Sequence, residues 1–94
     1  MNYPYFTKEA AEFLVSKNVE MIALDTPSPD SSHTKIGSTD DSQIHKIFLK
    51  NDILLVEYLA NLEKITDYHN WNIAVCPLKI TGADGSPARV FIFK

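Results

Sequence analysis

Two short runs of the chain are apolar at nearly every position, and they restrict the possible fold more than any other feature. The first covers residues 21–24, and the second covers residues 53–59, in which Glu57 is the only charged residue. A strand that is apolar on both faces needs cover on both faces, as the strands of α/β sheets have. We therefore expect an α/β fold in which both runs are strands.

Two other segments have the periodicity of amphipathic helices. The first follows Thr7, a residue type that caps helix N-termini, and Asn18 is a plausible left-handed stop. The second follows Ser42, carries His45 at the edge of its apolar face, and is broken at residues 51–52. The two apolar stripes consist of Ala10, Ala11, Leu14 and Val15 and of Ile44, Ile47 and Phe48.

The remaining segments predict a mixed sheet and one long loop. A helical turn is expected around 61–65, and residues 71–80 and 89–93 have the composition of two strands joined by a turn. Residues 26–41 are rich in proline, serine and charge, which is typical of a functional or mobile loop. We expect 33–41 to be the most mobile stretch. Cys76 precedes a proline within an apolar strand, so we expect it to pack in the core.

Size, charge and cysteine content exclude several classes of protein. Ninety-four residues suit a single domain spanning 1–94. A net charge of -3 argues against a nucleic-acid partner, since binding phosphate needs a basic surface. No apolar run reaches the roughly 20 residues of a membrane span. The single cysteine cannot form an internal disulfide, so a cytoplasmic location is expected.

Glu57 is the most informative residue for chemistry. A buried, ionised carboxylate costs several kcal/mol unless it is paired or bound to a cation. The alternative is that the strand ends early and that Glu57 faces water. His45 alone is a weaker candidate, because a histidine at the edge of a helix face is often simply packed or solvated. His33 and His69 lie in polar stretches and are weaker still, and no H-E-x-x-H, C-x-x-C or glycine-rich phosphate motif is present.

Taken together, these segments resemble the C-terminal half of the cyclase family, whose best-known members are bacterial kynurenine formamidases. The most specific feature is a histidine followed twelve residues later by a glutamate in an apolar run, ahead of Asn-Leu. The matching stretches are FTKEAAEFL at 6–14, IALDTPSPD at 22–30, HKIFLKNDILLVEYLANL at 45–62, PLKI at 77–80 and SPAR at 86–89.

This resemblance implies both a fold and a site. The fold would be a swivelling β/β/α half-domain, with a mixed sheet and two to three helices. His45 and Glu57 fall on metal-ligand positions of the family, so zinc or manganese would be bound there, in a site that need not be occupied in this chain. The implied reaction is metal-dependent hydrolysis of the amide of N-formylkynurenine or a relative.

The chain also departs from the family pattern. The main metal motif, H-x-G-T-H-x-D-x-P-x-H, lies in the N-terminal half of the family, and this sequence does not contain it. That motif carries most of the ligands and the catalytic histidine, so no catalytic residue is assigned here. Catalytic zinc normally has three protein ligands, so two leftover ligands would form a weak site. We expect this chain to be inactive alone and to bind a small-molecule substrate only if its site is completed.

Three functions remain open on the sequence alone. The first is the metal-dependent hydrolase part described above. The second is a small, non-catalytic oligomeric protein that keeps part of the fold for binding or scaffolding. The third is a metal-free binding module that uses the loop at 26–41 as its contact surface. Apolar strands without neighbours also predict either a homo-oligomer or a complex with a complementary N-terminal half.

Overall fold

A computed structural model describes all 94 residues. The chain divides into two compact units, Met1–Ala60 and Asn61–Lys94, and each is described by itself. The expected single domain over 1–94 stays a prediction. The elements in chain order are the helix α1 (Lys8–Ser16), the strand β1 (Met21–Ala23), the helix α2 (Gln43–Lys50), the strand β2 (Leu54–Val56), the 3-10 turn η1 (Leu62–Lys64), and the strands β3 (Asn72–Pro77) and β4 (Ala88–Phe93).

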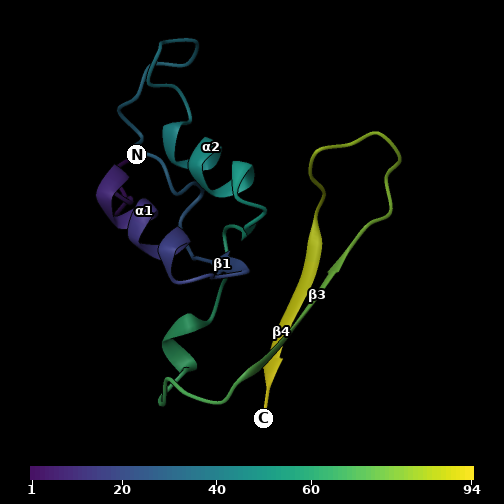
Figure 1. Cartoon of the computed structure of the whole chain (residues 1–94). Helices are drawn as coiled ribbons and strands as arrows, with labels where there is room; N and C mark the ends of the chain where they lie inside the picture. Colours follow the sequence, from purple (N-terminus) through teal and green to yellow (C-terminus); the bar gives the residue numbers. More distant parts are fainter. The chain divides into compact units, whose positions relative to one another are not determined.

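The first unit combines the two helices, labelled in Figure 1, with a parallel pair of strands, β1 and β2. Ile22 lies opposite Leu55 in this pair, and Met21 lies opposite Leu54. Side chains alternate between the two faces of a strand, so Ile22 and Leu55 share one face. That face packs against the helices in a core formed by Ala11, Ile22, Ile44, Phe48 and Ile53.

The other face of the β1–β2 pair has little cover. Ala23 is exposed, and Leu54 exposes 62% of its surface. Both faces of the apolar runs need cover, and within this chain only one face receives it, which agrees with the expectation of apolar strands without neighbours. The physical reason is that both helices pack on the Ile22 and Leu55 face, and none remains for the opposite face.

The second strand is also shorter than expected. The apolar run at 53–59 predicted a strand reaching Glu57, but β2 ends at Val56. Tyr58 adopts a left-handed conformation (φ 61°), which turns the chain out of the extended geometry. Backbone hydrogen bonds from Tyr58 to Thr26 (3.0 Å) and from Leu59 to Leu24 (3.0 Å) then hold this segment beside the end of β1.

The first helix follows its sequence signals. The Thr7 hydroxyl accepts a hydrogen bond from the Ala10 N–H at 3.1 Å, so Thr7 is the N-cap. Asn18 has φ 56°, the left-handed conformation that stops a helix. Phe6, just before the cap, packs edge-to-face on Phe48 of α2, with ring centroids 5.7 Å apart. This contact joins the start of α1 to the core.

The second helix is not capped as the sequence predicted. Ser42 occupies the N-cap position, but its conformation is left-handed and its side chain makes no capping hydrogen bond. The Asp30 carboxylate accepts the first-turn N–H groups instead: Ile44 N–H donates to Oδ1 at 2.7 Å and His45 N–H donates to Oδ2 at 3.0 Å. A carboxylate at this position also interacts favourably with the helix dipole. Asp30 is therefore the cap of α2.

The long loop contains two parts with different hydrogen bonding. Its start, up to Asp30, is tied to the fold because the Pro29 carbonyl accepts the Phe6 N–H at 3.0 Å. Residues 31–41 form turns, in which the Gly37 N–H donates to Asp41 at 2.8 Å. This bond is the main cause that holds the pKa of the Asp41 carboxyl below its ordinary value. The mobility expected for 33–41 stays a prediction.

The second unit is an antiparallel hairpin of β3 and β4, preceded by η1. The expected turn and both expected strands are present. Lys94 pairs with Asp67 and also lies over the Trp71 ring, 4.8 Å from its centroid. The Lys94 hydrogen bond lowers the pKa of Asp67.

Cys76 is a free thiol and is exposed, so the expected packing of Cys76 in the core is wrong. The physical reason is that β3 pairs with β4 alone.

No helix of the structure has both the length and the apolar character needed to cross a bilayer.

The capping arrangement predicts unequal effects for two substitutions. Asp30→Ala should lower the free energy of unfolding by about 2–3 kcal/mol, because it removes charge-assisted hydrogen bonds to two backbone N–H groups. Ser42→Ala should lower it by less than about 0.5 kcal/mol, since that hydroxyl caps nothing. Thr7→Ala, at a true local cap, gives a reference of about 1 kcal/mol. Urea denaturation followed by circular dichroism measures all three, and a Ser42 effect as large as the Asp30 effect would contradict the assignment.

Candidate metal site

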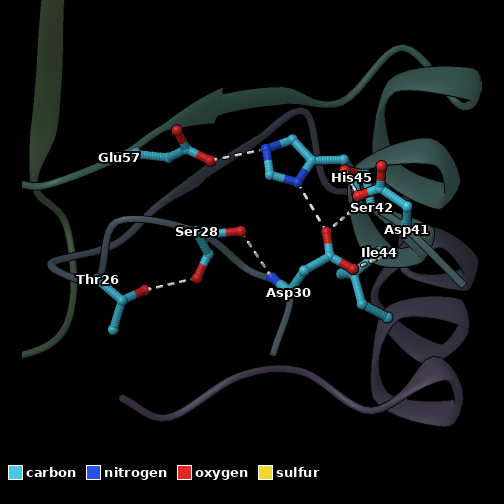
Figure 2. A network of polar contacts seen from close by, with 8 residues as sticks. All are labelled: Thr26, Ser28, Asp30, Asp41, Ser42, Ile44, His45 and Glu57. Atoms are coloured by element: carbon cyan, nitrogen blue, oxygen red, sulfur yellow. Dashed lines mark hydrogen bonds and ion pairs between the residues drawn. The ribbon is translucent and has the colours of Figure 1, made fainter. Parts of the chain in front are cut away.

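Three side chains from separate segments meet at one end of the β1–β2 pair (Figure 2). Asp30 follows β1 through the loop, Glu57 directly follows β2, and His45 lies in the first turn of α2. Because β1 and β2 are parallel, their carboxyl ends lie at the same edge, where open α/β sheets commonly bind ligands. The parallel pairing therefore brings residues 30 and 57 to the same place, and the start of α2 adds His45.

The His45 imidazole bridges the two carboxylates. Its Nδ1 lies 2.7 Å from Asp30 Oδ2, and its Nε2 lies 2.9 Å from Glu57 Oε1. The side chains of Asp30, His45 and Glu57 are 11%, 29% and 32% exposed. The site is thus closed on the Asp30 side and more open on the Glu57 side.

The two residues predicted from the sequence are brought together by the fold. His45 lies at the edge of the apolar face of α2, as expected, and its ring contacts Glu57. Glu57 is not inside the strand and is not deeply buried, so the expectation of a carboxylate enclosed by apolar neighbours is wrong. The alternative of a strand that ends early is correct, although the Glu57 carboxylate is paired with His45. Whether the pair binds a metal stays a prediction.

Asp30 is the residue of this site that the sequence did not single out. It is 8% exposed and is the one buried charged residue of the chain. Its N–H donates to the Ser28 hydroxyl at 3.0 Å, and the Thr26 hydroxyl donates to the Ser28 carbonyl at 2.9 Å. The only available signal was its position in the stretch IALDTPSPD, where the resemblance is strong, because a contact with a helix fourteen residues away leaves no local pattern.

The arrangement has the chemical form of a carboxylate–histidine unit whose second nitrogen faces another carboxylate. Histidines that bind metals commonly donate their other ring N–H to a carboxylate, which fixes the orientation of the ring. Here Asp30 lies in the position of that partner, and His45 Nε2 and Glu57 would be the groups left for a cation. No cluster of three or more metal-ligating side chains exists in the chain. His45 and Glu57 are therefore the candidate ligands within the chain.

The other histidines and the cavity do not extend this site. His33 and His69 are exposed and make no side-chain ion pair with a carboxylate. A cavity of about 260 Å³ lies beside Asp30, at the starts of α1 and α2, and includes Phe6 and Gln43 in its lining. Neither His45 nor Glu57 lines this cavity, so they do not converge on it.

Comparison with known proteins gives a consistent set of relatives. No protein-family model matches the chain. The chain is 32% identical over 92 residues to a kynurenine formamidase of Bacillus cereus, covering 95% of this chain and 39% of that protein. It is 33% identical over 92 residues to that of Bacillus cytotoxicus, with the same coverage, and 31% identical over 91 residues to that of Bordetella avium. The chain thus spans about two fifths of the length of the curated relatives it matches.

A solved structure has a similar fold. It is described as a potential metal-dependent hydrolase with cyclase activity, and it superimposes with a TM-score of 0.66 at 22% sequence identity. The match covers 96% of this chain and 41% of that one. This likeness confirms the cyclase-like α/β fold expected from the sequence. Together with the kynurenine formamidase matches, it identifies the chain as the counterpart of the C-terminal part of a cyclase-family protein.

Proposed function

We propose that this chain supplies His45 and Glu57 to the metal site of an amide hydrolase of the kynurenine formamidase type. The substrate of the completed site would be N-formylkynurenine or a related aryl formamide, which is cleaved to the amine and formate. The name of the relatives supports this reaction. The observation that carries the proposal is the His45 ring, held by Asp30 at Nδ1 and facing Glu57 with Nε2.

The donor set fits a divalent cation. Two carboxylates flank one imidazole at hydrogen-bond distance. A proton can satisfy the contact between Nδ1 and Asp30, and His45 Nε2 and Glu57 would then hold the ion. An imidazole nitrogen and a carboxylate oxygen suit both zinc and manganese. Such an ion would polarise the formyl carbonyl and increase the acidity of a water molecule.

The residues of this chain hold and orient the site but do not complete it. Asp30 fixes the His45 ring, His45 and Glu57 are the proposed ligands, and no further side chain of the chain reaches them as a third ligand. A catalytic zinc normally has three protein ligands and an open position. The remaining ligands and the base that activates water must therefore come from outside this chain. A cytoplasmic location belongs to the same proposal, since the single cysteine is a free thiol.

A partner is part of the proposal because the hairpin has large exposed apolar side chains. Ile73, Phe91 and Phe93 are each 42–49% exposed. A two-stranded hairpin is at best marginally stable in water without packing against other elements. We propose that a second copy of the chain, or a complementary N-terminal half of a cyclase-type protein, covers these surfaces. Association with a second copy, but not with an N-terminal half, would also suit the alternative function of a non-catalytic oligomeric scaffold.

Metal binding tests the ligand assignment directly. We expect Zn²⁺ or Mn²⁺ to bind weakly to the chain, and His45→Ala or Glu57→Gln to weaken binding at least about tenfold, since each removes one of two ligands. Isothermal titration calorimetry measures both affinities. His33→Ala and His69→Ala are matched controls, because both histidines are exposed and lie outside the site. Equal losses in these controls would show non-specific binding.

Activity of the isolated chain should be at background. Without a third ligand and a base, the chain should hydrolyse N-formylkynurenine no faster than its His45→Ala variant, with or without added metal. The assay follows kynurenine absorbance at matched protein concentrations. Turnover that disappears in His45→Ala would contradict the expectation and would mean that the missing groups are supplied in another way.

The partner proposal predicts the state of association. At micromolar concentration the chain should sediment as a species larger than its 10.6 kDa monomer. The exposed residues of the hairpin cause this association, so replacing Phe91 and Phe93 by serine should shift the distribution toward monomer. Sedimentation velocity measures both. A folded wild-type chain that sediments only as a monomer would refute self-association and leave the complementary half as the proposed partner.

A further inference from the structure

We infer that Asp30 is the positioning residue of His45: it starts the helix that carries the histidine and also fixes the proton of its ring on Nδ1. The part that concerns metal affinity rests on the proposed function, whereas the position of the proton does not. Both roles follow from the same carboxylate (Figure 2). Asp30 Oδ1 accepts from Ile44 N–H, and Oδ2 accepts from His45 N–H and lies 2.7 Å from His45 Nδ1.

The Asp30 carboxylate is held in place by contacts of its own chain segment. Asp30 is buried, and its N–H donates to the Ser28 hydroxyl. The neighbouring Pro29 is fully buried, and its carbonyl accepts the Phe6 N–H. A side chain fixed in this way needs little ordering to hold a partner, so it orients the ring more firmly than a mobile surface carboxylate would.

The surroundings of the two nitrogens decide which one carries the proton in the neutral ring. A neutral imidazole has one N–H and one lone pair, and each nitrogen here faces a carboxylate oxygen. Without a proton on Nδ1, two acceptors would face each other at 2.7 Å beside a buried carboxylate that has little access to water. Glu57 exposes 32% of its side chain and follows the end of a strand, so it can turn toward solvent at low cost.

The neutral ring should therefore be protonated on Nδ1, with its lone pair on Nε2. This is the opposite of the form that free histidine prefers, and it directs the metal-binding electron pair toward Glu57. The dual role of Asp30 also links the site to folding, because the side chain that caps α2 also positions the His45 imidazole. The cation site proposed above would then depend on a residue that need not touch the cation.

The position of the proton is measurable without metal or activity. Long-range ¹H–¹⁵N correlation spectra of the full chain, recorded at a pH where the ¹⁵N shifts show a neutral ring, distinguish the two forms. We expect the Nδ1–H form for His45 and the ordinary Nε2–H form for the exposed His33 and His69, which serve as internal controls. An Nε2–H form at His45 in the wild-type chain overturns the inference.

Two variants separate the role of Asp30 from that of Glu57. In Asp30→Ala the only carboxylate left is Glu57, so the proton should move to Nε2; in Glu57→Gln it should stay on Nδ1. Asp30→Ser, whose hydroxyl can still accept from one backbone N–H, is the substitute if Asp30→Ala does not fold. An unchanged Nδ1–H form in a folded Asp30 variant would refute positioning by Asp30.

Metal affinity is a separate readout. If the proposed function is correct, the Asp30 variants should bind Zn²⁺ about 10–100-fold more weakly although both ligands remain, as expected for loss of a partner that orients a ligand. Wild-type chain that binds no metal but shows the Nδ1–H form would refute the weak metal binding expected of this chain alone and leave the positioning role intact. Unchanged affinity in a folded Asp30 variant would refute the effect of positioning on the site.

Discussion

The contact between the Asp30 carboxylate and the first turn of α2 is the interaction on which the rest of the first unit depends. It supplies the cap that Ser42 does not provide, and it sets where the helix begins. The start of the helix in turn fixes where Phe48 enters the core and where His45 meets Glu57. Because charge-assisted hydrogen bonds to backbone N–H groups are among the stronger polar contacts, one side chain can determine this much.

The second constraint is the unequal cover of the strands. Two short helices cover one face of the β1–β2 pair, and in the second unit the hairpin has no helix of its own. Contiguous exposed apolar patches often mark interaction sites, which is the basis of the partner proposed above. The candidate site is incomplete in the same sense, because the proposed ligands are two and no group of three or more metal-ligating side chains is present. Both observations agree with the coverage of about two fifths of the relatives' length.

The site illustrates how a parallel pair of strands collects residues that are distant in sequence. Asp30 and Glu57 each follow the carboxyl end of one strand, so they are neighbours because the strands pair, although 27 positions separate them. His45 reaches the same place through the helix between the strands. The result is an ordered row of carboxylate, imidazole and carboxylate in which each ring nitrogen has a defined partner.

The sequence by itself determined those features that depend on neighbouring residues. The cap at Thr7, the stop at Asn18 and the apolar stripe of each helix arise from contacts within one or two turns, so they were predictable. The pairing of His45 with Glu57 was reached from the resemblance of one stretch, 45–62, to a known pattern rather than from local physics. The tertiary structure alone decided the rest. Asp30 caps a helix fourteen residues away. The strand β2 ends at Val56 because its partner β1 has only three residues and the chain then turns at 58. Such contacts depend on which segments pack together, and no local spacing encodes them.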